Sequence, residues 1–356
     1  METFDYSKQE LTDDCCSSEM NDSASEESVK WEVFYNCGYW KPHGKGCAGE
    51  EIILDRHFNW GNEAWYIPAV YACNEGLVID FCVGIKSKYL KDFMDKWKWP
   101  PISEEPISME KREQLERENP LVIEFRPYLM LNHKEIHPKH SYEISWIPID
   151  ILPDGMENTI EATQLVKHYR LDTAQAWAFH RWSYPWDAKK KPIIKSLKLR
   201  LERNPTSIIS MHFKNPVVGD VFHFVHPVSG VEHKLAIQAY DQQELPKSTK
   251  SLLQDNYIFP TQYVAMIYTL EPDLMDRNIQ VQDCVENDQP KQKQEDPFEP
   301  KASSIGIISG ADRPTSKNGQ NRHGTMSALH FEQVADIEWR VVLQEKIMDD
   351  IEVSLI

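Results

Sequence analysis

The sequence lacks the short motifs that mark several common enzyme classes. It contains no GxSxG element of serine hydrolases, no HExxH element of metalloproteases and no Walker A phosphate-binding loop. An active site can also be built from residues that are scattered along the chain. Whether the protein is an enzyme is therefore left open, and the missing motifs favour a function without catalysis.

Positive charge is also scarce. The chain has 39 Lys and Arg side chains against 56 Asp and Glu side chains, and its formal charge at pH 7 is -17. Binding to a phosphate backbone or to an anionic membrane surface needs a basic surface. We therefore expect no nucleic acid and no membrane among the partners of this protein.

Long apolar runs and paired cysteines are missing as well. The most apolar long window, Ala64–Ile85, contains Asn74, Glu75 and Asp80, which are costly inside a bilayer. The N-terminus has neither the basic start nor the apolar run of a signal peptide. The seven cysteines are an odd number and include no CxxC pair, which fits reduced thiols. These features predict a cytoplasmic protein.

The clearest structural signal is a β-hairpin within Gly219–Leu245. Val221–His226 alternates with a period of two, Pro227-Val228-Ser229-Gly230 has turn composition, and Val231–Tyr240 returns. We expect a positive φ at Gly230. If Pro227 pairs with Val231, His223 and His233 share one sheet face, where they could ligate a metal or simply pack. A register slip of one residue would pair His226 with His233 instead.

Apolar runs of strand length are more frequent than helical patterns. Besides the hairpin, the strand candidates are Ile52–Leu54, Ala64–Cys73, Leu77–Val83, Leu121–Leu131, Tyr142–Ile147, Ile193–Leu201, Thr206–Phe213, Tyr257–Leu270, Ser327–Phe331, Ile337–Gln344 and Ile351–Leu355. Capping residues predict helices from Ser87 to about Trp97, from Ser108 to Asn119, and over about 159–170 and 173–182. The predicted fold is α+β and β-rich, an antiparallel sandwich or partly closed barrel with a few short helices.

Composition divides the chain into four parts. Residues 1–29 carry nine acidic side chains and one lysine and are expected to form a disordered acidic tail. Residues 30–275 would form the β-rich core, as one unit or as two subdomains with a boundary near 150–190. The polar stretch 276–325 is expected to be a flexible insertion, and 326–356 to supply strands that complete the core.

A second candidate metal site lies in a glycine-rich loop. Cys37, His43 and Cys47, with His57 further on, are residue types that zinc prefers, although their spacing is not a standard zinc pattern. The alternative is a loop with two ordinary thiols. His133, His137 and His140 could serve a metal or acid–base chemistry, or form a solvated turn.

One aromatic cluster is also a candidate site. Trp177, Trp182, Tyr184 and Trp186 lie beside His180 and Arg181 and could bind a sugar or a cation. The alternative is that these rings fill the core at the end of a helix.

One short segment resembles a known family. Ser304–Thr315, SIGIISGADRPT, resembles the SIGIIGGADGPT segment of the β subunit of sodium-translocating decarboxylases. The resemblance implies that Asp312 corresponds to an aspartate in a membrane-embedded ion site of that family. Ser309 and Arg313 each replace a glycine, and no membrane spans surround the segment, so we do not carry ion transport over to this chain. Ile305–Ile308 is expected instead to form a short docking strand.

The sequence as a whole predicts a β-rich cytoplasmic protein that binds a small molecule or a protein partner without catalysis. The alternative is a metal-dependent enzyme that uses a Cys/His site with zinc. The candidate metal ligands are then Cys37, His43, Cys47, His57, His223 and His233.

Overall fold

The computed structural model describes residues 31–36, 38–39, 47–99, 108–186, 191–245, 257–275, 277–292 and 321–356. Strands make up 48% and helices 11% of the described residues, which confirms the predicted β-rich α+β class. Every strand pair in the described residues is antiparallel, and the sheets pack against one another without closing into a barrel.

Two sheets form a first sandwich. One sheet has the order β1 (Glu50–Trp60), β2 (Glu63–Ala72), β3 (Gly76–Ile85), β7 (Ala176–Pro185) and β6 (His140–Trp146). The other has the order β18 (Ile351–Ser354), β8 (Leu197–Arg203), β4 (Phe125–Leu131) and β5 (Lys134–Ile136). Their facing sides bury Trp65, Phe81 and Leu199, and α1 (Ser87–Trp97) adds Leu90 and Phe93 to this core.

The outer face of the five-stranded sheet is covered as well. Helix α3 (Ile160–His168) is capped by Thr159, whose hydroxyl accepts the Ala162 N–H, and packs Leu165 against Phe179 on β7. The segment 31–35 covers Val78 on the same face. Strand β3 is consequently buried at all of its positions, with Phe81 in the first core and Val78 and Cys82 in two clusters on the outer face.

Two further sheets form a second sandwich. Their strand orders are β10 (Val221–Val225), β11 (Glu232–Glu244), β13 (Gln262–Glu271), β16 (Arg322–Met326), and β14 (Ile279–Asp283), β17 (Glu338–Glu345), β9 (Thr206–Lys214). Leu235, Met266 and Trp339 lie in the core between them. Strands β12 (Tyr257–Ile258) and β15 (Lys291–Gln292) pair with each other in a separate two-stranded sheet. Each sandwich therefore has its own hydrophobic core.

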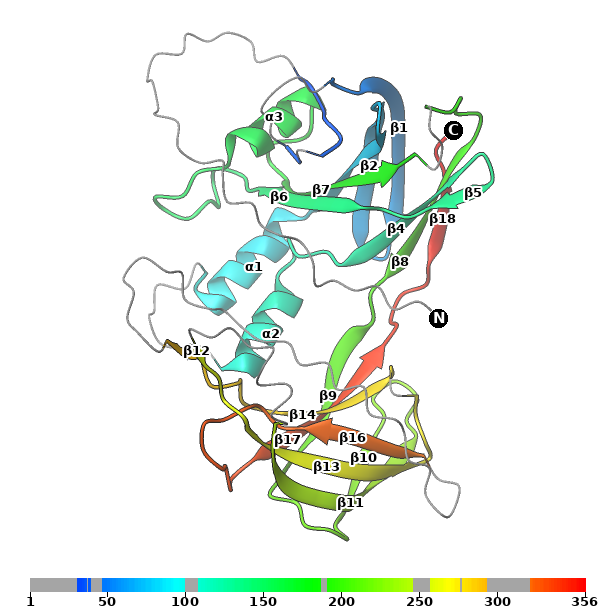
Figure 1. Cartoon of the computed structure of the whole chain (residues 1–356). Coiled ribbons are helices and arrows are strands. Elements are labelled where there is room, and N and C mark those ends of the chain that lie inside the picture. Colours follow the sequence, from blue (N-terminus) through cyan, green and yellow to red (C-terminus); the bar gives the residue numbers. More distant parts are fainter. Residues whose placement is uncertain are drawn as a thin grey trace.

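The two sandwiches are joined at two places where the chain passes directly between them (Figure 1). Strand β8 of the first sandwich is followed after Asn204-Pro205 by β9 of the second, and β17 of the second is followed by β18 of the first. Helix α2 (Met109–Glu118) lies between the two sandwiches on the other side (Figure 1). Among the described residues, no helix has the length and apolar character of a membrane span.

The predicted helix over 173–182 is wrong. These residues belong mostly to β7, which pairs with both β3 and β6. Asp172 accepts the Ala174 N–H, so its side chain closes a local turn and does not start a helix. Pairing on both sides with the sheet outweighs the local capping signal at this position.

The polar stretch 276–325 also contains strands. Ile279 and Val281 are buried in the second core and alternate with Gln280 and Gln282, which is the pattern of a half-buried edge strand. Arg322–Met326 pairs with β13. Two parts of this stretch therefore form strands, while 293–320, which include Asp312, lie outside the described residues, as do 1–30. The division of the chain into four parts stays a prediction.

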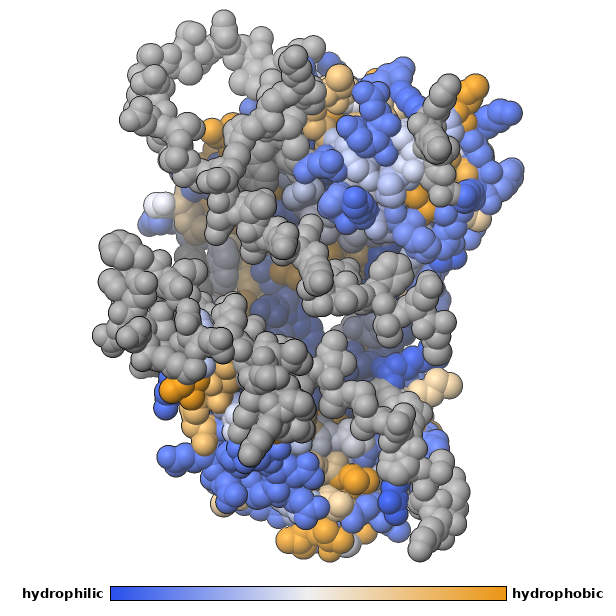
Figure 2. Space-filling view, in the orientation of Figure 1, coloured by the Kyte–Doolittle hydropathy of each residue, from blue (hydrophilic) through white to orange (hydrophobic). Residues whose placement is uncertain are grey.

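The hairpin turn forms where it was expected. Gly230 has a φ of +71°, which confirms the predicted positive φ. The register differs from both expected alternatives, because His223 pairs with Lys234 and Phe224 with His233. Exposed valines, among them Val225 and Val228, lie around this hairpin, and Figure 2 shows hydrophobic surface at this end of the second sandwich.

Candidate functional site

Helix α2 is rich in charged residues, and its two faces contact different sandwiches. Ser108 caps it by accepting the Lys111 N–H, and none of its residues is buried. The face toward the first sandwich carries Leu115, which packs against the first core, and Glu118, which accepts hydrogen bonds from Lys96 (2.5 Å) and Trp97 (2.9 Å) of α1. The hydrogen bond from Lys96 is the main reason that the pKa of Glu118 falls to about 2.

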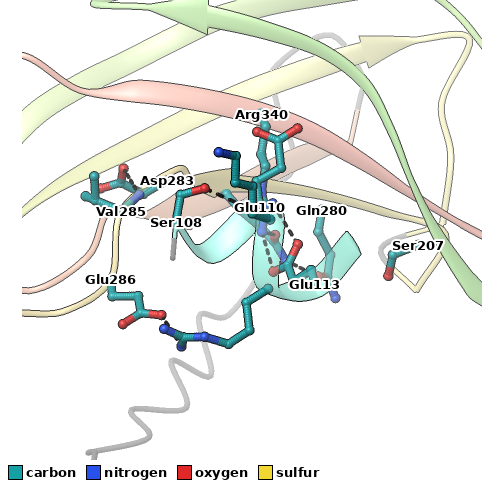
Figure 3. A network of polar contacts seen from close by, with 12 residues as sticks. Ser108, Glu110, Glu113, Ser207, Gln280, Asp283, Val285, Glu286 and Arg340 are labelled. Carbon is teal, nitrogen blue, oxygen red and sulfur yellow. Dashed lines mark hydrogen bonds and ion pairs between the residues drawn. The ribbon is translucent and has the colours of Figure 1, made fainter. Parts of the chain in front are cut away.

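The opposite face of α2 meets the second sandwich through a buried arginine. Arg340 on β17 is 1% exposed and donates to both carboxylate oxygens of Glu113 at 2.7 and 2.6 Å, and to Gln282 at 2.9 Å. Figure 3 shows Arg340 directed at Glu113 across the gap between strand and helix. Such a bidentate ion pair fixes both the distance and the orientation of the two side chains, so it holds α2 against β17.

A second ion pair joins the start of α2 to a loop of the second sandwich. Arg112 donates to Glu286 at 2.6 Å, and Glu286 lies in the loop between β14 and β15 (Figure 3). His212 on β9 is 3.8 Å from Glu110. Arg117 also donates to the Ser207 carbonyl of β9 at 3.1 Å. Charged side chains of α2 thus make these contacts with the second sandwich.

A pocket opens beside this ion pair. It has a volume of about 460 Å³ and is lined by Met109 and Arg112 of α2, Pro260, the stretch Val281–Asp283, the loop Val285–Pro290 and the segment Thr325–Leu329. This volume is in the range of small-molecule sites. The lining contains three carboxylates, Asp283, Glu286 and Asp288, and one cationic side chain, Arg112.

Backbone contacts of acidic and amide side chains build the pocket wall. Asp283 accepts the N–H groups of Val285 and Ala328, and Asn287 accepts the Leu329 N–H. Asp288 accepts the Phe331 N–H at 2.9 Å. Burial raises the pKa of Asp283, and the backbone hydrogen bonds oppose that shift in part. These side chains fix two loops against each other, so the pocket is pre-formed.

The residues predicted to bind zinc are not assembled in the described part of the chain. Cys37 and His43 lie outside the described residues. Cys47 is an exposed free thiol, and His57 is exposed on β1, stacked on Tyr66 and 3.4 Å from Asp55. Within the described residues, no group of three or more His, Cys, Asp and Glu side chains could hold a metal. The loop site itself stays a prediction.

The two hairpin histidines lie on opposite faces of their sheet. His223 is exposed and 3.2 Å from Glu232, whereas His233 is buried in the sandwich with its Nδ1 2.7 Å from the Pro272 carbonyl. The expected shared face is therefore wrong, because the register is shifted relative to the pairing that it required. The structure instead brings His226 and His233 together, with ring centroids 6.0 Å apart.

The remaining candidates lie partly at the surface and partly in the hydrophobic cores. His137 is exposed beside Glu135, and His140 begins β6. Trp177 packs beneath α3, while Tyr184 lies in the first core.

Gly44, Gly46 and Gly49 have the GxGxxG spacing, but Gly49 leads into β1 and not into a helix, so the dinucleotide-binding context is missing.

Sequence reasoning missed the pocket and its ion pairs. Arg112, Glu286 and Arg340 are far apart in the chain, and Glu286 lies in the stretch expected to be flexible. The one available signal was the alternation of Ile279 and Val281, which marks a strand. Searches against protein-family models, curated proteins and solved structures found no match.

Proposed function

We propose that this is a non-catalytic binding protein whose pocket between α2 and the second sandwich takes a small cationic ligand. The observation that supports this most directly is the pocket lining, which has three carboxylates and a single cation, Arg112. Arg112 already pairs with Glu286 at the pocket wall. A ligand with a guanidinium or ammonium group would form the same contact, which is worth about 0.2–1 kcal/mol because both side chains are about half exposed.

Agmatine is a suitable probe because it carries both a guanidinium and an ammonium group. We expect isothermal titration calorimetry to detect its binding to the full chain. Glu286→Gln should weaken binding about 2- to 5-fold, which corresponds to the loss of about 0.4–1 kcal/mol. Arg112→Ala should strengthen binding, since it removes the internal competitor.

The matched control is Glu352→Gln, an exposed carboxylate on β18 of the first sandwich. It should leave agmatine binding unchanged, because it alters the net charge equally without touching the pocket. If agmatine does not bind, or if Glu286→Gln and Glu352→Gln have the same effect, the pocket is not a cation site.

The second candidate function is a metal-dependent enzyme that uses Cys37, His43, Cys47 and His57 with zinc. The residue types in this loop favour it. Metal analysis of the purified chain distinguishes the two functions. Stoichiometric zinc that is lost in Cys47→Ser would support the enzyme, and a folded, metal-free protein would contradict it.

The proposed setting is the cytoplasm, with neither nucleic acid nor membrane as partner. The net charge of -17 supports this, because it repels phosphate groups and anionic lipid surfaces. The four free cysteines among the described residues fit a reducing compartment.

A further inference from the structure

Two neighbouring residues of α2 connect the pocket to the contact between helix and second sandwich. Arg112 lines the pocket and donates to Glu286 at 2.6 Å. The next residue, Glu113, accepts two hydrogen bonds from Arg340 of β17, at 2.7 and 2.6 Å. Figure 3 shows Glu113 and Arg340 directed at each other, with Glu286 on the same side of the second sandwich. Because Arg112 and Glu113 are adjacent on one helix, the position of α2 on β17 decides whether Arg112 reaches Glu286.

The two ion pairs differ in strength. Arg340 is buried and its pair with Glu113 is bidentate, which fixes the geometry of both side chains. Arg112 and Glu286 are each about half exposed and share one hydrogen bond, so solvent weakens their attraction. The Glu113–Arg340 pair therefore holds α2 in place, and the Arg112–Glu286 pair adds a smaller contact that a competing cation can replace.

The other end of α2 belongs to the first sandwich. Glu118 accepts hydrogen bonds from Lys96 and Trp97 of α1, and Leu115 packs against the first core. None of these residues lines the pocket. A ligand in the pocket thus affects only the end of α2 that contacts the second sandwich.

We propose, on the basis of the proposed function, that a cation bound in the pocket loosens α2 from the second sandwich and so regulates the contact between the two sandwiches. A ligand guanidinium on Glu286 takes the place of the Arg112 Nη1 group, and α2 then loses its tie to the loop between β14 and β15. The helix keeps the Glu113–Arg340 pair but detaches from β17 more often.

This coupling is reciprocal, because it is a difference in free energy between two states of α2. Whatever loosens α2 also raises the affinity of the pocket for the cation, by the same factor. The exposed Arg112–Glu286 pair sets the upper limit of the effect at about 5-fold in either direction.

Hydrogen–deuterium exchange of the full chain with and without agmatine measures the opening of α2. At saturating agmatine we expect the amides of α2 to exchange about 2- to 5-fold faster, while those of α3 on the first sandwich stay unchanged. In Arg112→Ala, α2 should exchange faster even without agmatine, and agmatine should add nothing.

The sign of this change is decisive, because Met109 is the other residue of α2 in the pocket lining. A ligand that held α2 through Met109 would slow the exchange of α2. Slower or unchanged exchange of α2 in the wild type with agmatine bound would overturn the proposal.

The reciprocal effect is measured by calorimetry with Glu113→Gln. Although this substitution removes a negative charge, we expect it to raise the affinity for agmatine about 2-fold, within the limit set by the exposed pair. It should bring no gain when Arg112→Ala is already present. Glu116→Gln, at an exposed position of the same helix, is the matched control and should not raise the affinity. Equal gains in Glu113→Gln and Glu116→Gln would contradict the coupling.

Failure of the coupling can be told apart from failure of the cation site itself. Agmatine that binds without faster exchange in α2 would contradict the coupling alone. Agmatine that binds neither the wild type nor Arg112→Ala would contradict the proposed function, and the coupling with it.

Discussion

Two buried arginines, Arg181 and Arg340, are neutralised in different ways. The partner of Arg181 is Asp80, a buried residue on the adjacent strand of the same sheet. The partner of Arg340 is Glu113, which is 45% exposed and belongs to a helix outside the second sandwich. A buried guanidinium that loses its partner is an uncompensated charge. The stability of the second sandwich consequently depends on the position of α2.

This dependence can be measured with Glu113→Gln. The substitution keeps the size of the side chain but removes the charge that pairs with Arg340, and we expect it to lower the free energy of unfolding by about 1–3 kcal/mol, less than for a fully buried pair. Urea denaturation measures the change. Glu110→Gln on the same helix is the control and should cost less than about 0.5 kcal/mol, because its contact with His212 is 3.8 Å and exposed. Equal effects of the two substitutions would mean that Arg340 does not need Glu113.

Gly230 is a second residue whose role depends on local conformation. Its φ of +71° is strained for residues with a β-branched side chain, and a Cβ at this position would meet nothing within 4 Å. Gly230→Val should lower the free energy of unfolding by about 1–3 kcal/mol through backbone strain alone. Gly230→Asn should cost less, since Asn tolerates this region better. Thermal or urea denaturation of both variants is the measurement, and a Val variant as stable as the wild type would contradict the turn geometry.

At the scale of elements, α1 and α2 behave as a pair. Glu118 at the end of α2 accepts hydrogen bonds from Lys96 and Trp97 of α1 and from Gln114 one turn earlier. The other end of α2 is fixed to the second sandwich by Arg340 and Glu286. The helix pair therefore connects the two sandwiches, because the two ends of α2 contact different ones.

The contact between Glu118 of α2 and helix α1 should be sensitive to acid. Hydrogen bonds from Lys96 and Gln114 lower the pKa of Glu118 to about 2, from its ordinary value of 4.5. A lowered folded-state pKa stabilises the fold above pH 4.5 and loses that effect as the pH falls toward 2. Glu118→Gln should therefore reduce stability at pH 7, with a difference from wild type that shrinks as the pH falls below about 4.5. Denaturant titrations from pH 7 to 3 would show this, and the exposed Glu116→Gln should run parallel to wild type at every pH.

At the scale of the whole molecule, the last 36 residues join both sandwiches. Strand β16 pairs with β13, β17 pairs with β9 and β14, and β18 pairs with β8. Three sheets thus include strands from residues 321–356. Neither sandwich is complete without this segment.

Proteolytic cleavage between Gln292 and Asn321 tests this interlocking. The two pieces should elute together in size-exclusion chromatography under native conditions, because hydrogen-bonded ladders in three sheets hold the C-terminal piece. They should separate in denaturant. A C-terminal piece that elutes alone without denaturant would show that these strands do not hold the molecule together.

The sequence by itself determined the local elements whose signals are periodic. The alternation of Val221–Val225, the apolar runs of β2 and β3, and the cap at Ser108 all act through neighbouring residues, so they can be recognised without the fold. The glycine of the hairpin turn belongs to the same group, because its φ is set by the turn itself. The β-rich class follows from the number of such strands.

Only the tertiary structure decided how these elements pair and what they bring together. The hairpin register is fixed by which side chains enter the second core, and a shift of one residue moved His223 to the opposite face from His233. A local capping pattern predicted a helix where β7 forms, because pairing with the two neighbouring strands outweighs that local signal. The pocket and the Arg340–Glu113 ion pair join residues from distant segments, and such proximity arises from sheet order and packing, which no local pattern encodes.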